Sequence, residues 1–121
     1  MKLGTLLATV VLVLLAGVAH AADLFTQPIP VATGQLIVCR IANVGAQERA
    51  VSITVIDSTG DTVTSSGALS IPAGQTAALA ALTASQSYCK FSVEGAKSSF
   101  RAGASVHDTS NGTDTFAGSA N

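Results

Sequence analysis

The stretch Gln35-Leu36-Ile37-Val38-Cys39-Arg40-Ile41-Ala42-Asn43 is a run of β-branched and apolar residues with a cysteine at its centre. Because successive side chains of a strand point to opposite faces, Ile37, Cys39 and Ile41 share one face while Arg40 lies on the other. This alternation predicts a strand with Cys39 on its buried face. Everything that follows in the chain is expected to cover that face.

A second strand-like run, residues 88–94, carries the only other cysteine, Cys89. We predict a disulfide between Cys39 and Cys89, which would tie the middle of the domain to its C-terminal part. For a loop of about 50 residues, the chain-entropy model gives the bond roughly 4 kcal/mol, a large share of the about 5–15 kcal/mol that holds a domain folded. The alternative is two free thiols or a redox pair, but the spacing is unlike C-x-x-C.

The N-terminus has the features of a cleavable secretory signal. Met1-Lys2 gives a positive start, residues 3–18 are apolar, and Ala19-His20-Ala21 matches an A-x-A cleavage site. We expect a helical signal over residues 1–21. Its apolar run is shorter than the about 20 residues that cross a bilayer, and no other segment approaches that length, so no membrane span is expected after signal removal. Export to the periplasm or the extracellular space follows, where a cysteine pair is usually bonded.

The part of the chain after Ala21 has 100 residues, the size of one domain. It has no tryptophan and no methionine, so its core must be mainly aliphatic. Five basic and seven acidic residues give it a net charge of −2. Because no basic run is present, the composition argues against a nucleic acid or an anionic membrane as partner.

Short strand-like runs separated by turns continue to residue 107. Pro28 and Pro30 limit the first run to an irregular edge strand. Residues 76–82 contain helix-favouring alanines, but the segment is short and bounded by turns, and we interpret it as a strand. Seven or eight runs at about 8–12-residue spacing predict an all-β fold, an antiparallel two-sheet β-sandwich, with a small barrel as the alternative.

The run that carries Cys89 is expected to form one arm of a hairpin. A turn at residues 95–98 leads from it to a further run at residues 100–107. If the turn is tight, Val93 faces Phe100, and the inward-facing apolar sets of the two runs are in register. The second arm would supply the last strand of the domain, which a pilin-type subunit lacks and borrows from a neighbour.

The outer face of this hairpin holds the candidate contact residues. With the apolar sets facing inward, the polar residues on the other side are Lys90, Ser92, Glu94, Arg101, Ser105 and His107. Cross-strand ion pairing among Lys90, Glu94 and Arg101 is the ordinary explanation, each pair contributing under about 1 kcal/mol. The alternative is that these three residues form a contact surface for another protein or a glycan.

The end of the chain has a different composition. Residues 108–121 are rich in Ser, Thr, Asn, Gly and Asp, and Phe116 is their one aromatic residue. Such a composition at a terminus is typical of a mobile segment. The sequence therefore predicts a signal peptide over residues 1–21, a β-sandwich over residues 22–107 and a disordered polar tail over residues 108–121.

Several motifs follow one another in the predicted domain: Cys39-Arg40-Ile41-Ala42-Asn43, residues 51–57 with the turn Ser58-Thr59-Gly60, Pro72-Ala73-Gly74-Gln75-Thr76, Tyr88-Cys89-Lys90-Phe91 and Phe100-Arg101-Ala102. As a set they resemble a group of small exported bacterial proteins of unassigned function, and the resemblance implies no catalytic residues. The chain also looks like the immunoglobulin and fibronectin type III sandwich. It departs from the immunoglobulin pattern in having no tryptophan, and in placing Tyr88 directly before Cys89.

Catalytic and metal chemistry have little support in the sequence. His107 is the only histidine after signal removal, whereas copper sites need two and zinc sites about four ligands, so we expect no metal and no cofactor. We interpret His107 and Asp108 as a strand-end pair. No G-x-S-x-G elbow is present. We therefore predict a non-catalytic exported binding or structural module; the alternative is a small secreted enzyme inhibitor or a hydrolase with an unrecognised site.

Overall fold

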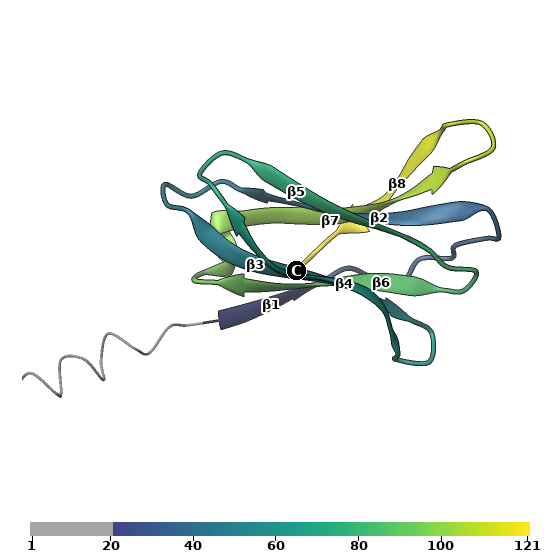
Figure 1. The fold of residues 1–121 in the computed structure, drawn as a ribbon, viewed down its shortest axis with the longest axis horizontal. Coiled ribbons are helices and arrows are strands. Elements are labelled where there is room, and N and C mark those ends of the chain that lie inside the picture. The colour runs from purple at the N-terminus through teal and green to yellow at the C-terminus, as the bar shows by residue number, and fades with distance from the viewer. Residues whose placement is uncertain (1–20) are drawn as a thin grey trace, which may run out of the picture.

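A computed structural model describes residues 21–121; residues 1–20, which hold most of the predicted signal peptide, lie outside the described residues. Two antiparallel four-stranded sheets face each other (Figure 1). The strands are β1 (Ala21–Phe25), β2 (Gln35–Asn43), β3 (Arg49–Asp57), β4 (Thr62–Ile71), β5 (Thr76–Leu82), β6 (Ser87–Glu94), β7 (Phe100–Asp108) and β8 (Asp114–Ser119). The first sheet has the order β1-β6-β3-β4 and the second sheet the order β5-β2-β7-β8. The predicted all-β two-sheet fold is confirmed, with eight strands.

Two segments with mixed sequence signals are edge strands. β1 ends before Pro28 and Pro30 and pairs with β6 alone among the strands, as expected of a run limited by prolines. β5 is a strand despite its alanines, because its backbone pairs with β2 while Ala77 and Leu79 pack against the core. Tertiary pairing here outweighs helix propensity, which is worth less than about 1 kcal/mol per residue.

The core lies between the two sheets and is mainly aliphatic. Ile37 and Ile41 of β2 are 0% and 1% exposed, while Arg40 between them lies on the outer, exposed face. Phe91 of β6 heads the largest fully buried side chains. Burying one such side chain stabilises a fold by about 1.5–3 kcal/mol. The period-two alternation of the sequence therefore places apolar side chains between the two sheets, and their burial holds the sheets together.

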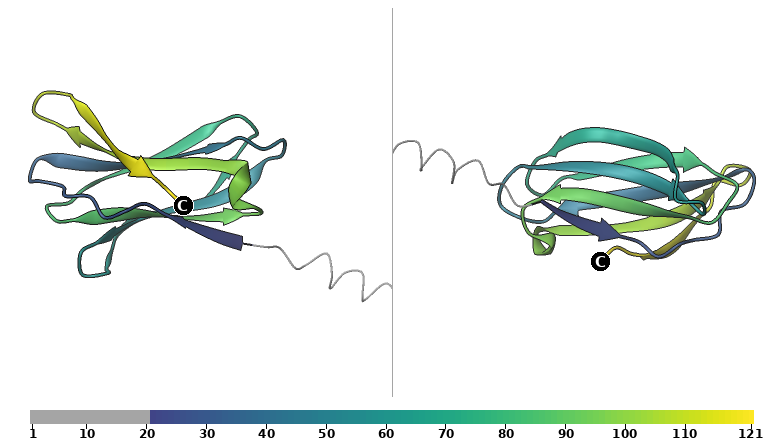
Figure 2. Two further views of the ribbon diagram at one scale, coloured as in Figure 1. Left: turned by 180° about the vertical axis from the view of Figure 1, so that it is seen from behind. Right: turned by 90° about the horizontal axis from the view of Figure 1, so that it is seen from below.

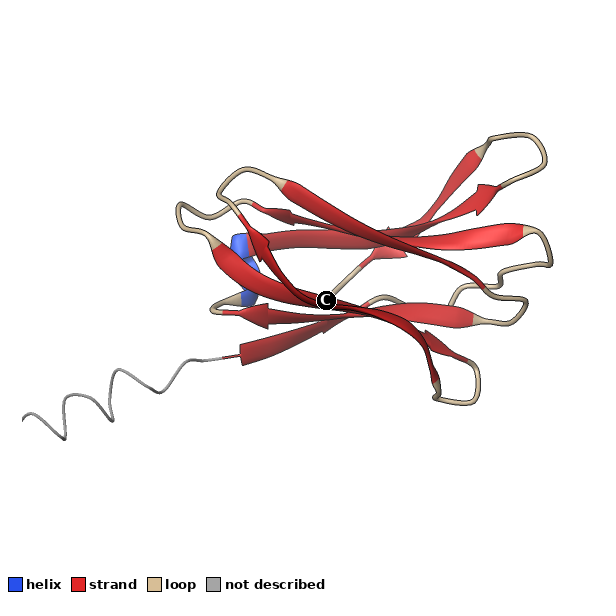
Figure 3. Cartoon of the chain, in the orientation of Figure 1, coloured by secondary structure: helices blue, strands red, loops and turns tan. Residues whose placement is uncertain are grey.

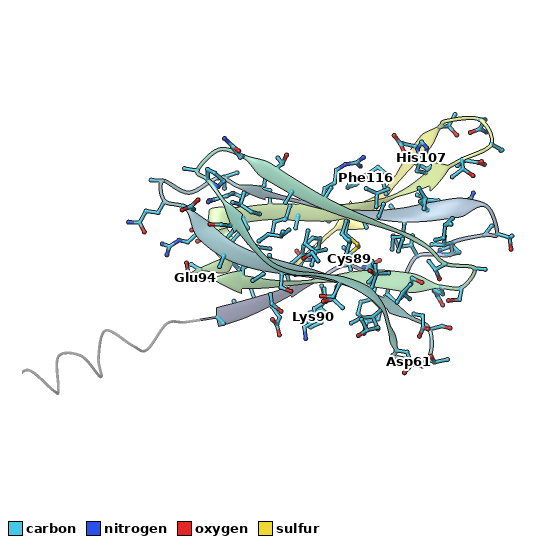
Figure 4. All side chains as sticks on the ribbon, viewed as in Figure 1. Asp61, Cys89, Lys90, Glu94, His107 and Phe116 are labelled. Carbon is cyan, nitrogen blue, oxygen red and sulfur yellow. A yellow bond between two sulfur atoms is a disulfide. The ribbon has the colours of Figure 1, made fainter. Side chains whose placement is uncertain are left out.

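Cys39 of β2 and Cys89 of β6 form the predicted disulfide. Their Cα atoms are 5.9 Å apart, and both residues are fully buried. β2 is an inner strand of the second sheet and β6 an inner strand of the first, so the bond joins the two layers at their middle (Figure 4). The sequence separation of 50 residues makes it a long-range link.

Asn43, at the end of β2, is a fully buried amide with every polar atom satisfied. Its Nδ2 donates to the carbonyls of Gln47 at 2.7 Å and Ile71 at 2.9 Å, and its Oδ1 accepts from the Gly45 N–H at 3.0 Å. Leaving such a group unpaired would cost about 1–3 kcal/mol. One side chain thus fixes the β2–β3 loop and anchors the end of β4.

The predicted hairpin between residues 88–94 and 100–107 is wrong. β6 belongs to the first sheet and β7 to the second, and the short 3-10 helix η1 (Lys97–Ser99) carries the chain from one layer to the other (Figure 3). Val93 pairs with Ala22 and Val51, whereas Phe100 lies opposite Asn43. Alternation shows which residues of a strand face the core. Two strands that pack on opposite sides of one core show the same alternation as two strands paired in a hairpin, so the pattern alone does not distinguish the two arrangements.

The predicted disordered tail is also wrong, because residues 114–119 form β8. Its backbone pairs with β7, and the chain then runs back toward β1 (Figure 2). The Ala120 N–H donates to the Ala102 carbonyl at 2.9 Å, and Asn121 exchanges two backbone hydrogen bonds with Phe25. This end of the chain buries little apolar surface, so its order comes from backbone pairing, which composition does not reveal. The sandwich therefore extends to the last residue.

Candidate functional site

The candidate contact residues predicted from the sequence do not come together. Lys90 and Glu94 lie on β6 in the first sheet, whereas Arg101 lies on β7 in the second. Glu94 has Arg49 as its ion-pair partner, with 3.9 Å between Oε1 and Nη1. Arg101 Nη1 donates instead to the carbonyls of Ser98 and Phe100, at 3.1 and 2.8 Å. The proposed surface depended on the hairpin and is lost with it.

His107 pairs with a different acid from the one predicted. Its Nδ1 lies 2.6 Å from Asp114 Oδ1, across the β7–β8 pair, and the two side chains are 32% and 52% exposed. Asp108 accepts hydrogen bonds from the Ser110 hydroxyl and N–H, and these lower the pKa of its carboxyl group below 3.8. The predicted His107–Asp108 pair is therefore replaced by a His107–Asp114 contact and a capped turn.

The outer face of the second sheet carries a hollow of about 300 Å³, which we call the Arg40 hollow. Its lining includes Val38, Arg40, Arg101, Gly103, Ser105 and Phe116. These residues come from β2, β7 and β8, so the site depends on the strand that the sequence did not predict. Volumes of this size fall at the lower end of those seen for ligand pockets.

Gly103 lines the hollow and allows β8 to lie close against β7. It is the register partner of Arg40 on the neighbouring strand. A Cβ atom at this position would lie 2.8 Å from the Gly118 carbonyl oxygen and 3.5 Å from Phe116 Cε2. β8 therefore passes so close to β7 that only glycine fits. The same approach brings the Phe116 ring, which is 72% exposed, to the wall of the hollow.

The charges at the hollow are positive and lack acidic neighbours. Arg40 Nη1 donates to Ser105 Oγ at 2.9 Å, which orients the guanidinium group. Neither Arg40 nor Arg101 has an ion-pair partner within residues 21–121, and no carboxylate lines the hollow. A guanidinium group has five N–H donors, so Arg40 keeps several available. The arrangement suits an anionic group joined to an apolar body that would rest against Val38 and Phe116.

Sequence reasoning missed Arg40, Gly103 and Phe116 as a group. The signal for Arg40 was present, since a lone arginine interrupts the apolar outer face of the strand at residues 35–43. Gly103 and Phe116 carried no such signal, because their roles depend on β8. In residues 21–121, His, Cys, Asp and Glu side chains form no group of three or more that could hold a metal ion.

In the part of the chain that the structure describes, no helix has the length and apolarity needed to cross a membrane. Comparisons of the chain with family models, with curated proteins and with solved structures give no match.

Proposed function

We propose that the protein is an exported, non-catalytic binding module that holds a partner protein at the Arg40 hollow, through a carboxylate of that partner. The observation that carries the proposal is that one hollow brings together an exposed phenylalanine and two arginines that have no acidic partner among residues 21–121. Arginine and aromatic side chains are enriched in the centres of protein interfaces. An arginine–carboxylate contact can also be bidentate, which adds directional specificity.

A protein partner fits the walls of the hollow better than a glycan does. Apart from its two arginines, the lining offers the hydroxyls of Thr76 and Ser105 as polar side chains, and the rest is Val, Ile, Ala, Gly and Phe. A glycan presents hydroxyl groups on all sides, and each one buried without a partner has a desolvation cost. An acidic side chain or a C-terminal carboxylate next to an apolar residue avoids that cost.

Export is supported by two independent features. The predicted signal over residues 1–21 ends at Ala21, directly at the start of β1. The buried Cys39–Cys89 disulfide is of the kind that persists in oxidising compartments such as the periplasm or the extracellular space. The proposal therefore places the hollow where it would meet other exported proteins.

The architecture is best understood as an immunoglobulin-like sandwich with exchanged end strands. β2 pairs with β5, as strand B pairs with strand E in immunoglobulin domains, and β3 pairs with β6, as strand C pairs with strand F. The disulfide joins the second and sixth strands, as the B–F bond does in those domains. In those domains the first strand accompanies the second and the last accompanies the sixth. Here β1 lies beside β6, and β7 lies beside β2. The outer face of the second sheet next to β2 is therefore formed by β7 and β8.

A non-catalytic role is proposed because the histidine–carboxylate contact lies on an exposed strand pair. His107 and Asp114 are at the β7–β8 edge, and neither lines the Arg40 hollow. Within residues 21–121, no serine hydroxyl hydrogen-bonds this imidazole. A hydrolase would need an acid, a base and a nucleophile within reach of one substrate position.

The test is an NMR titration of the mature protein with N-acetylphenylalanine and with its amide, two probes that differ only in the carboxylate. We expect shifts at the Arg40 side chain and the Phe116 ring with the acid and much weaker binding of the amide. Arg40→Gln should weaken binding of the acid by about 10–100-fold, the loss of one charge-assisted hydrogen bond. Arg49→Gln, on the other sheet, is the matched control and should have no effect.

Equal binding of the acid and the amide, or an unaffected Arg40→Gln variant, would contradict the proposal. Binding of a uronic acid oligosaccharide in place of the acid probe would point to a glycan partner and would also overturn it.

A further inference from the structure

Among residues 21–121, no strand pairs with the outer edge of β5, the outermost strand of the second sheet (Figure 1). The Asn43 N–H donates to the Gln75 carbonyl at 2.9 Å, directly before β5 begins. In an antiparallel pair, alternate residues direct both backbone polar groups to the partner strand. Ala77, Leu79 and Ala81 therefore direct theirs to β2. The residues whose N–H and C=O groups point to the free side are Thr76, Ala78, Ala80 and Leu82.

This edge lacks the protection that the other three edges have. β1 is short and carries Asp23, and its Phe25 is paired with Asn121. β4 has a positive-φ glycine, Gly67, and two register shifts, and β8 has one register shift against β7. The sequence of β5, T-A-A-L-A-A-L, contains no charge, no proline and no glycine. Uncharged regular edges of this kind readily pair with another strand.

The strand is also nearly symmetric about its centre. On either side of Leu79 stand two alanines, so an antiparallel copy can lie opposite with Ala78 facing Ala80 and Leu79 facing itself. In this register the hydrogen-bonded pairs between the two copies fall on the residues whose backbone groups point to the free side, which are Thr76, Ala78, Ala80 and Leu82. Leu79 points inward and is only half-buried at the open side of the sandwich. A second Leu79 would cover it.

We propose that the β5 edge is a dimer interface, in which β5 of a second copy of this chain adds to the second sheet about a two-fold axis through Leu79. The result is one continuous eight-stranded sheet, because each copy contributes the four strands of its second sheet. Such an isologous contact closes on itself and leaves no further edge of this kind. The outer faces of both copies, and with them both Arg40 hollows, lie on the same side of the joined sheet.

Sedimentation equilibrium of the mature, oxidised protein tests the interface. We expect a dimer for the natural sequence and for Ala80→Thr, which keeps the N–H. Ala80→Pro removes an N–H that points away from β2, so it preserves the monomer ladder and is tolerated on an edge. It should weaken dimer association by at least about tenfold, because each dimer loses two donors. Circular dichroism and thermal unfolding would verify that both variants fold.

Amide hydrogen exchange gives a second measurement that needs no variant. The amides of Ala78 and Ala80 should become more protected as protein concentration rises, while that of Leu79, bonded to β2, should be protected throughout. A monomer at every concentration overturns the proposal. So does a dimer that Ala80→Pro leaves intact with Ala78 and Ala80 unprotected, since the contact then lies elsewhere. Neither result bears on ligand binding at Arg40, which uses other residues.

Discussion

Phe25 and Asn121 exchange two backbone hydrogen bonds, with N···O distances of 2.8 and 3.0 Å. Phe25 ends β1, at the edge of the first sheet, and Asn121 follows β8, at the edge of the second. The last residue of the chain thus closes one side of the sandwich. Both ends of the domain are held by the same contact, although the composition around each end is polar or proline-rich.

Removal of residues 120 and 121 should lower stability. It deletes the two bonds to Phe25 and the bond from the Ala120 N–H to the Ala102 carbonyl. At about 0.5–1.5 kcal/mol each, less the entropy regained by the freed chain end, we expect a loss of about 1–3 kcal/mol. Urea unfolding measures this loss, and faster amide exchange at Phe25 should accompany it. Unchanged stability would show that these three hydrogen bonds do not stabilise the fold.

The Cys39–Cys89 bond should account for a large part of the stability. Replacing both cysteines by alanine removes a link that spans 50 residues between the two layers. We expect the free energy of unfolding to fall by about 2–5 kcal/mol. Denaturant unfolding of the double variant, compared with the oxidised protein and with the protein kept in reductant, gives the value. Identical midpoints for all three would contradict the structural role of the bond.

Gly103→Ala should detach β8. The new Cβ would lie 2.8 Å from the Gly118 carbonyl oxygen, so one of the two strands has to move. We expect a cost of about 1–3 kcal/mol, as for other overpacked sites, and loss of amide protection in residues 115–119. Ser105→Ala, at the next outward position of β7, is the control: it loses the bond to Arg40 but adds no atoms. Equal protection of β8 in both variants would rule out the steric explanation.

The turn after β3 should make stability sensitive to acid. Asp57 Oδ1 accepts hydrogen bonds from the Thr59 hydroxyl at 2.7 Å and from the Asp61 N–H at 3.0 Å, and these lower the pKa of Asp57 below 3.8. A group whose pKa is lower in the folded state stabilises the fold above its unfolded pKa and loses that contribution as pH falls through the folded value.

Urea midpoints measured from about pH 6 down to about pH 2 should therefore fall for the natural protein below about pH 3.8. Asp57→Asn should flatten this part of the profile. Asp108→Asn should act in the same direction, because Asp108 caps its own turn in the same way. A profile that Asp57→Asn leaves unchanged would show that the Asp57 turn does not govern the response.

The sequence alone determined the class of fold. Alternation in residues 35–43 placed Ile37 and Ile41 inside, and it also placed Cys39 where it could meet Cys89. These inferences succeeded because burial of alternate side chains is a local property that a single strand reveals. β5 was identified as a strand on a different basis, its short length between two turns, in spite of its alanines.

Only the tertiary structure decided which strands are neighbours. Val93 and Phe100 both face the core, as their alternation indicates, but they do so from opposite sheets. β8 has little apolar pattern and is held by backbone pairing with β7, which is a property of two segments and not of one. The Arg40 hollow follows from both facts, since it forms where β7 lies beside β2 and β8 crosses Gly103. Periodicity assigns a residue to a face, whereas pairing between distant segments decides what that face meets.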